Sequence, residues 1–134
     1  MAKQSFLEKL RLSPPASFHV LDPAKAKRMN ATTLYIPGPA EVARAINAIP
    51  KGQTRNIVDL RQALATEGDA DTACPAATLK YWKWMAQASE EPGGKTSPYA
   101  IPWWRVLKDG KPSRHMPGGV ERHIAMLTRE GVKI

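Results

Sequence analysis

Residues 101–119 contain the feature that most restricts how this chain can fold, two adjacent tryptophans enclosed by residues that turn the backbone. Pro102 fixes its own φ and also restricts the conformation of the residue before it. Residues 108–111 (KDGK) are a strong turn signal, and residues 117–119 (PGG) are flexible enough to adopt positive φ. The tryptophans must therefore lie where the backbone turns repeatedly.

We expect this stretch to form a pocket with flat walls and a positively charged rim. Indole rings stack well on nucleobases, and glycines let the backbone come close to a ligand. The candidate pocket residues are Trp103, Trp104, Arg105, Met116, Pro117, Gly118 and Gly119. The alternative is that the two tryptophans are core side chains at a junction between a strand and a loop.

The charge balance favours a polyanionic partner. The 134 residues include 20 Lys and Arg against 12 Asp and Glu, which gives a formal net charge of +8. Such an excess steers a protein toward polyanions but does not specify a fold. The length predicts one domain with a modest core, and we expect a monomer.

Cysteine content and hydropathy exclude several classes of protein. A single cysteine excludes an intramolecular disulfide and any multi-cysteine metal cluster, and the three histidines lack metal-ligand spacing. We therefore expect no metal and no cofactor. No apolar run approaches the roughly 20 residues of a membrane span, and the N-terminus lacks the apolar core of a signal peptide. A soluble, cytoplasmic protein with no membrane partner is expected.

Apolar spacing predicts helices with short strands between them. Residues 4–12 form a weak helix, and residues 18–21 and 34–36 are candidates for short strands. A helix that begins at Pro39 has an apolar stripe of Val42, Ala45, Ile46 and Ile49. A last helix has a stripe of Val120, Ile124 and Leu127.

Two helices separated by a tight loop predict a helix-turn-helix. Asn56, followed three positions later by Asp59, resembles a capping box at the start of the first helix. Pro75 suits the first position of the second helix, which follows a loop over residues 66–72. This order of elements is typical of a DNA-binding motif.

The helix from Pro75 has a polar stripe suited to a DNA backbone. The polar stripe comprises Lys80, Lys83 and Gln87. The apolar stripe comprises Leu79, Trp82, Met85 and Ala86, with Tyr81 and Trp84 between the two stripes. Either lysine could instead be an ordinary solvated residue. The same two readings apply to a basic cluster of Lys25, Lys27 and Arg28.

The tryptophan stretch resembles the active-site region of the O6-alkylguanine-DNA alkyltransferases and, more closely, that of the alkyltransferase-like proteins. Residues 102–106 (PWWRV) match the family pattern Pro-Cys-His-Arg-Val, and Gly118-Gly119 matches the Gly-Gly that closes the family's flipped-base pocket. Residues 130–131 (EG) match a further landmark near the C-terminus.

Two departures from the family pattern decide what the resemblance implies. Trp103 stands at the position of the acceptor cysteine, and Trp104 stands at that of the activating histidine. Alkyltransferase-like proteins also carry tryptophan at the cysteine position but usually keep the histidine. The resemblance therefore implies a divergent, non-catalytic member and not an enzyme. In a true alkyltransferase Glu130 would support the histidine network, and a helix-dipole or salt-bridge role is its alternative here.

The helix-turn-helix region extends the resemblance to about residues 39–133. Residues 49–52 (IPKG) resemble the family's Ile-Pro-x-Gly, and Ile57 replaces the tyrosine that helps rotate a phosphate during base flipping. The helix from Pro75 takes the place of the recognition helix. The family's intercalating arginine falls near Leu79 or Lys80, so the finger is absent or is a lysine.

Cys74 allows a different chemistry. A thiol at a helix N-terminus can have a lowered pKa and accept an alkyl group. No base is near it along the chain, so a packing or capping role is the alternative that we favour.

We expect a small α/β domain, mostly α, of winged helix-turn-helix type. Residues 1–35 would be an N-terminal extension packed on the domain, and residues 36–134 would be the DNA-binding domain. The expected DNA contacts are Lys51, Arg55, Asn56, Lys80, Tyr81 and Lys83.

By resemblance, the protein would bind double-stranded DNA in the nucleoid and receive an alkylated or damaged base in the pocket. It would then flag that base for other repair proteins. A general nucleic-acid binder without lesion specificity is the first alternative. An alkyl-accepting enzyme that uses Cys74 is the second.

Overall fold

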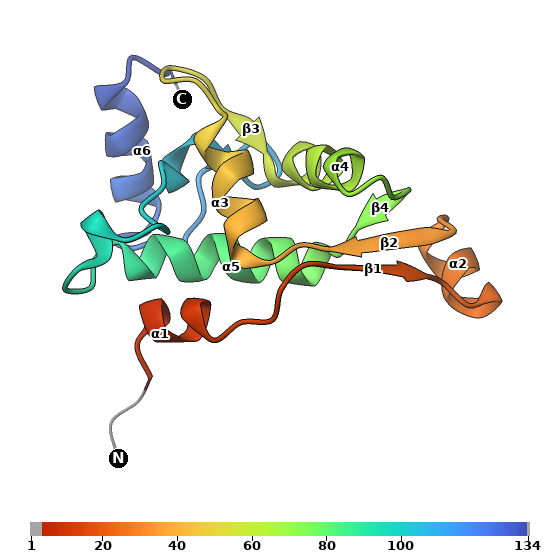
Figure 1. Cartoon of the computed structure of the whole chain (residues 1–134). Coiled ribbons are helices and arrows are strands. Elements are labelled where there is room, and N and C mark those ends of the chain that lie inside the picture. The colour runs from red at the N-terminus through yellow and green to blue at the C-terminus, as the bar shows by residue number, and fades with distance from the viewer. Residues whose placement is uncertain (1–3, 134) are drawn as a thin grey trace.

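The computed structural model describes residues 4–133, so residues 1–3 and 134 of the two expected segments lie outside the described residues. Figure 1 shows a mixed α/β fold in which helices predominate, and this confirms the expected class. The helices are α1 (Phe6–Arg11), α2 (Pro23–Met29), α3 (Pro39–Asn47), α4 (Ile57–Glu67), α5 (Pro75–Ala88) and α6 (Gly119–Arg129). Two 3₁₀ turns are η1 (Gly94–Thr96) and η2 (Trp103–Arg105). The strands are β1 (Ser17–Val20), β2 (Thr33–Ile36), β3 (Arg55–Asn56), β4 (Thr72–Ala73) and β5 (Val106–Leu107).

Two small sheets connect segments that are far apart in the sequence. In the first sheet β2 pairs antiparallel with β1 and parallel with β4. In the second sheet β3 pairs in parallel with β5, with Arg55 opposite Val106 and Asn56 opposite Leu107. The second sheet thus fixes the start of α4 beside the residues that follow the tryptophan pair.

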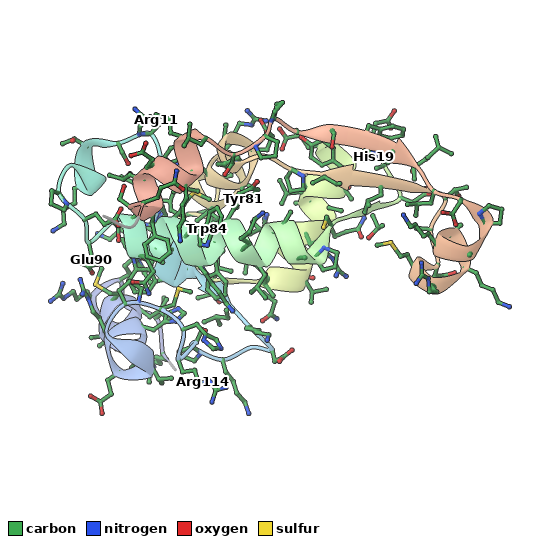
Figure 2. All side chains as sticks on the ribbon, turned by 90° about the horizontal axis from the view of Figure 1, so that it is seen from below. Arg11, His19, Tyr81, Trp84, Glu90 and Arg114 are labelled. Carbon is green, nitrogen blue, oxygen red and sulfur yellow. The ribbon has the colours of Figure 1, made fainter. Side chains whose placement is uncertain are left out.

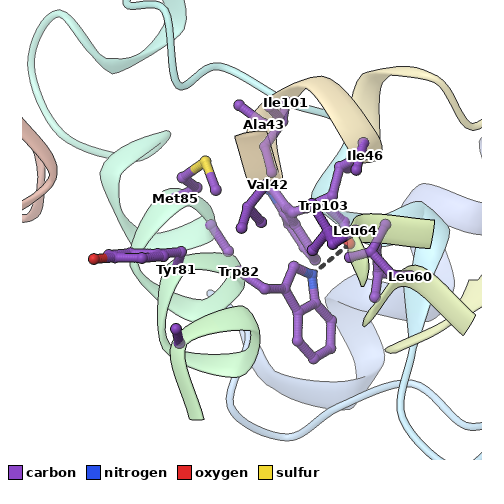
Figure 3. Close-up of a cluster of buried hydrophobic side chains, with 14 of the residues drawn as sticks. Val42, Ala43, Ile46, Leu60, Leu64, Tyr81, Trp82, Met85, Ile101 and Trp103 are labelled. Atoms are coloured by element: carbon purple, nitrogen blue, oxygen red, sulfur yellow. Dashed lines mark hydrogen bonds between the residues drawn. The ribbon is translucent and has the colours of Figure 1, made fainter. Parts of the chain in front are cut away.

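Helix α5 is the centre of the packing. Pro75 occupies its first turn, where a missing N–H costs no hydrogen bond, and the helix contacts α1, α3, α4 and η2. Trp82 and Trp103 are the largest fully buried side chains. The Nε1 of Trp82 donates a hydrogen bond of 3.0 Å to the carbonyl oxygen of Trp103 (Figure 3). This buried bond joins α5 to η2.

The predicted apolar stripes hold for the helices before α5. The side chains of the α3 stripe are all buried: Val42, Ala45, Ile46 and Ile49. In α4, Leu60 and Leu64, which are one turn apart, are fully buried, and Ile57 is half-buried. In α6, however, Leu127 is buried while Val120 is exposed, and the second core position is taken by His123. Of the stripe predicted for the last helix, Leu127 is therefore correct, Ile124 is only half-buried and Val120 is wrong.

The N-terminal residues pack on the rest of the domain at two places. Leu10 of α1 is fully buried against the core, and α1 lies along α5. The backbone N–H groups of Phe6 and Leu7 each donate a 2.9 Å hydrogen bond to the Glu91 carboxylate. Strand β1 pairs with β2, and α2 follows at the far end of this hairpin, which projects from the helices (Figure 1).

The capping box expected at the start of α4 does not form. Asn56 is at the N-cap position, but its side chain makes no capping hydrogen bond. Its Oδ1 instead accepts a 2.6 Å hydrogen bond from the N–H of Gly110. The amide therefore ties the 108–111 turn to the start of α4, a long-range contact that local sequence spacing does not reveal.

We expect Trp82→Phe to lower the free energy of unfolding by roughly 2–4 kcal/mol. The substitution removes part of a buried ring and leaves the Trp103 carbonyl without its donor. Chemical denaturation followed by far-UV circular dichroism measures the change. Val58→Ala, at a position 54% exposed, should change stability by less than about 0.5 kcal/mol. Equal losses in the two variants would contradict this account of the core.

Candidate nucleic-acid interface and pocket

Helix α5 presents one long face to solvent. The side chains on this face are Ala76, Leu79, Lys80, Lys83 and Gln87, which are exposed or half-buried. The view in Figure 2 shows α5 between α1 on one side and the segment that carries Arg114 on the other. The helix is therefore accessible along this face only, and the predicted polar stripe lies on it.

Two aromatic side chains of α5 are placed differently from the prediction. Tyr81, an expected DNA contact, is only 2% exposed because position 81 falls on the core-facing side of the helix. Trp84 is half-buried at the edge of the exposed face. The Nζ of Lys80 lies 4.7 Å from the Tyr81 ring centroid and 5.1 Å from that of Trp84. The aromatic rings thus support Lys80 and are not themselves the contact surface.

Positive charges gather beside α5. The pKa of His115 is lowered, and the positive charge of Lys83 is the largest cause. Desolvation and the charges of Arg114 and Lys108 lower it further. Gln87 Nε2 donates a hydrogen bond of 3.4 Å to the His115 carbonyl oxygen, which ties this segment to α5. We call Lys83, Lys108, Arg114 and His115 the basic strip.

A tight turn supports one end of the basic strip. The backbone groups of Lys108 and Lys111 exchange two hydrogen bonds of 3.0 Å. Asp109 and Gly110 between them have φ of 54° and 71°, the left-handed conformation of a two-residue hairpin turn. The Asn56 side chain holds this turn against α4. Two lysines are thereby presented on a small, anchored hairpin next to a pair of helices.

Three predicted DNA contacts do not lie on the α5 face. Lys51 is exposed in the loop between α3 and β3. The neighbouring Gly52 N–H is 3.5 Å from Glu130 Oε1, so this loop lies against the end of α6. Arg55 is half-buried in β3, and the Asn56 side chain is used by the turn. Of the six predicted contacts, Lys80 and Lys83 are the two on the exposed face of α5.

Trp103 is a core residue. It is 2% exposed, and its ring lies edge-on to those of Trp104, at 5.6 Å between centroids, and His123, at 5.5 Å. Its carbonyl oxygen accepts the hydrogen bond from Trp82. The alternative reading of the sequence, core aromatics at a junction of elements, describes this residue.

Only some of the residues predicted for the base pocket line the same pocket. A pocket of about 510 Å³ is lined by Trp103, Trp104 and Arg105, as expected. Its other walls come from α6 and from the segment between α5 and η2, with Lys95, Arg122, Met126 and Arg129 among them. Met116 to Gly119 do not line it. Met116 and Pro117 are buried, and Gly118 and Gly119 begin α6.

The two glycines have a structural role at the start of α6. Gly118 and Gly119 have φ of 80° and 74°, which side-chain-bearing residues rarely adopt. A Cβ on Gly118 would also overlap the Arg122 side chain. The Gly-Gly pair is therefore required for the turn into α6, which accounts for it without a ligand.

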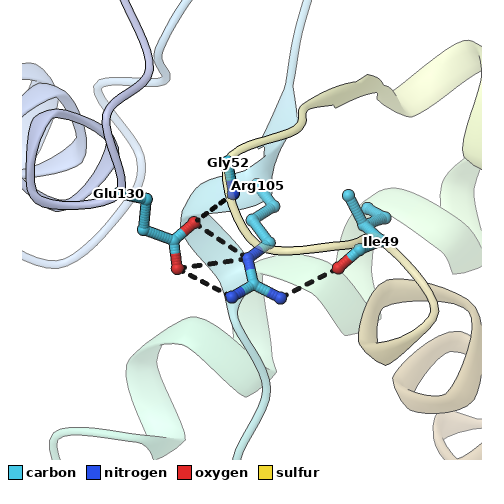
Figure 4. Close-up of polar contacts among 4 residues, drawn as sticks. All are labelled: Ile49, Gly52, Arg105 and Glu130. Carbon is cyan, nitrogen blue, oxygen red and sulfur yellow. Dashed lines mark hydrogen bonds and ion pairs between the residues drawn. The ribbon is translucent and has the colours of Figure 1, made fainter.

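Arg105 is committed to an ion pair. Its Nε and Nη2 donate hydrogen bonds of 2.9 and 2.7 Å to the Glu130 carboxylate, and its Nη1 donates one of 2.8 Å to the Ile49 carbonyl oxygen (Figure 4). The hydrogen bonds from Arg105 lower the pKa of Glu130, although burial acts in the opposite direction. The salt-bridge role that we considered for Glu130 is therefore confirmed.

The pocket wall contains one buried polar atom without a partner. Trp104 is half-buried, and among the described residues its Nε1 makes no hydrogen bond. The indole nonetheless lies close enough to Glu130 to contribute to the lowered pKa of that carboxyl group.

His123 is the buried residue that the sequence did not reveal. Its Nδ1 accepts a 2.9 Å hydrogen bond from the Ser113 N–H, so the proton is on Nε2, which donates 2.8 Å to the Trp104 carbonyl oxygen. Burial lowers the pKa of His123, and the bond to Trp104 opposes this effect. The neutral ring joins α6 to the tryptophan pair. A single polar residue in an apolar stripe gave no signal for this role.

Cys74 caps α5. Its Sγ accepts a hydrogen bond of 3.5 Å from the Ala77 N–H, and the side chain is half-buried. This is the capping role that we favoured over a nucleophile. Within residues 4–133, no three His, Cys, Asp or Glu side chains come together in a way that could hold a metal ion.

No protein-family model, curated protein or solved structure matches this chain. The resemblance to the alkyltransferases consequently stays a prediction from sequence motifs. In the part of the chain that the structure describes, no helix combines the length and the apolar character that crossing a membrane requires.

We expect the free energy of unfolding to fall as the pH decreases from about 7 to about 5. The folded-state pKa of His123 lies below the ordinary value of about 6.5. Its contribution is therefore complete above that value and is lost as the pH falls toward the folded-state pKa. Urea denaturation at a series of pH values measures this dependence.

His123→Gln should remove most of that dependence on pH. A glutamine amide can accept from Ser113 and donate to Trp104, but it carries no titrating proton. His115→Gln is the comparison variant: the pKa of His115 is also lowered, so it contributes in the same direction, but its side chain is exposed and we expect its share to be smaller. An unchanged pH dependence in His123→Gln would show that burial of this ring does not set the acid sensitivity.

Proposed function

We propose that this protein binds double-stranded DNA through the exposed face of α5 and the adjacent basic strip. The observation that carries the proposal is the placement of Lys108, Arg114 and His115 beside Lys83 of α5: Lys108 lines a pocket with Thr78 and Leu79, and the Gln87 side chain holds the His115 backbone. Like charges placed this close repel one another in the free protein. A phosphate backbone relieves that repulsion and releases its own counterions.

The arrangement of α4, α5 and the 108–111 turn supports a winged helix-turn-helix reading. Helix α5 offers an exposed surface with small or flexible side chains at Ala76, Leu79 and Gln87. The hairpin turn with Lys108 and Lys111 stands beside it, held by Asn56 at the start of α4. In such proteins the second helix enters a groove while neighbouring elements contact the backbone.

The proposal includes the absence of alkyl transfer. The side chain at the position that resembles an acceptor cysteine is the buried indole of Trp103, and Cys74 is occupied as a helix cap. Neither group offers a free thiolate next to a base, which such a transfer needs. We therefore propose a DNA-binding protein that recognises its target without chemical change.

Recognition of a damaged base is a second candidate function, supported by the 510 Å³ pocket. Trp104 supplies a half-buried indole at its wall, and Lys95 and Arg129 add positive charge, while the charge of Arg122 is paired with Glu90, which also lines the pocket. An alkylated base turned out of the helix could stack there. The protein would then mark the site for other repair proteins.

We expect Lys80→Ala and Lys83→Ala each to weaken binding to duplex DNA of any sequence. Each change should also reduce the slope of log affinity against log salt concentration by about 1, the effect of losing one phosphate contact. Fluorescence anisotropy of a labelled duplex over a series of salt concentrations measures both quantities. Lys27→Ala removes the same charge from the exposed surface of α2 and should have little effect. Equal losses in all three variants would place the interface elsewhere.

A duplex that contains O6-methylguanine tests the second candidate. We expect it to bind more tightly than the unmodified duplex and to quench tryptophan fluorescence, with no change in the intact mass of the protein. Trp104→Ala should remove the preference and leave the affinity for the unmodified duplex unchanged. Equal affinity of the wild-type protein for both duplexes would exclude the second candidate and leave the first intact.

A further inference from the structure

Strand β1 is the open edge of the three-stranded sheet. The strand order is β1-β2-β4, and α4 packs against β4 at the opposite edge. The sequence of β1, SFHV, contains no proline and no lysine, the residues that usually protect an edge from pairing with another chain. Phe18 is 50% exposed and Val20 is 76% exposed. This edge is therefore unprotected in both its backbone and its side chains.

The hydrogen bonds of the sheet show which backbone groups of β1 are free. The Cys74 N–H donates to the Tyr35 carbonyl oxygen, so Tyr35 directs its backbone groups toward β4. Leu34 and its partner His19 then bond to each other, because the direction of backbone groups alternates along a strand. The Leu21 N–H donates to the Thr32 carbonyl oxygen, two residues beyond the His19–Leu34 pair, which fits the same alternation. The N–H and C=O groups of Phe18 and Val20 consequently point away from the sheet.

These free groups are complementary to themselves. If two copies of β1 meet antiparallel with His19 opposite His19, then Phe18 of each copy lies opposite Val20 of the other. Residues that face each other in this way exchange both backbone hydrogen bonds. All the outward-facing backbone groups of the two strands would then be paired. Phe18 and Val20 of both copies would also meet on one face of a continuous six-stranded sheet.

We propose that the β1 edge is a homodimerisation surface, with a second copy of this chain as its partner. This replaces our expectation of a monomer, and it is independent of whether the chain binds DNA. The antiparallel arrangement also suits the charge of the molecule. The basic helix α2 follows β1 directly, so the two α2 helices come to opposite ends of the paired strands. Their lysines and arginines are thereby kept apart.

A disulfide across the proposed two-fold axis tests the register. The pair His19–His19 would be of the non-hydrogen-bonded kind, with Cα atoms about 4.5 Å apart, within the range of about 4.4–6.8 Å that a disulfide spans. In a Cys74→Ser background, where serine is a favoured helix cap, His19→Cys should form covalent dimers under mild oxidation. The matched control is Leu12→Cys, at an exposed position outside the sheet. Cross-linking no faster in His19→Cys than in Leu12→Cys would overturn the proposal.

The second measurement is analytical ultracentrifugation of the full chain, with no cysteine introduced or removed. The wild-type protein should shift from a 14.7 kDa species toward twice that mass as its concentration rises. Val20→Lys should raise the dimer dissociation constant at least about tenfold, because each dimer loses two apolar contacts. Leu12→Lys, with the same change in charge at a position 61% exposed, should associate like the wild type. A wild-type protein that stays at 14.7 kDa at every concentration would overturn the proposal.

Discussion

The hydrogen bond from the Trp82 indole to the Trp103 carbonyl oxygen connects the central helix to the stretch that follows it. Both side chains are fully buried, so neither group can exchange this partner for water. Around the bond, Arg105 continues the connection to α3 and α6 through Ile49 and Glu130. The tryptophan stretch thus holds α3 and α6 at fixed positions relative to α5.

The buried position of the tryptophan stretch explains why the basic strip and the pocket beside Trp104 are separate surfaces. Trp103 lies in the core, and residues 116–119 do not line the pocket beside Trp104. The remaining pocket opens on the side of α6 and the end of α5, while the basic strip lies along the middle of α5. Binding of DNA to the basic strip would therefore not by itself bring a base into the pocket. The two candidate functions therefore use separate surfaces, because the Trp103 indole is part of the core.

Periodicity in the sequence predicted the elements better than it predicted the contacts between them. The stripe of α3 and the leucines of α4 follow from helical spacing, because a helix with one apolar face has one way to bury it. The roles of Asn56 and Arg105 depend on Gly110 and Glu130, whose proximity is set by tertiary structure. His123 was missed because a buried histidine is recognisable only by its partners, Ser113 and Trp104. Lys80 and Lys83 were placed on the exposed face of α5 because their spacing opposes the apolar stripe, which fixes a direction from sequence alone.

The parallel pairing of β3 with β5 has a consequence for how the chain folds. It joins residues 55–56 to residues 106–107. Helix α1 likewise contacts segments far along the chain, α5 and the Glu91 carboxylate. The residues of β3 and the Trp82 indole precede their partners, β5 and the Trp103 carbonyl, in the order in which the chain is made. Contacts of such long sequence separation slow folding, since the loop must close before the contact repays its entropy. A chain that ended before residue 103 would therefore lack the partners of both the Trp82 indole and β3.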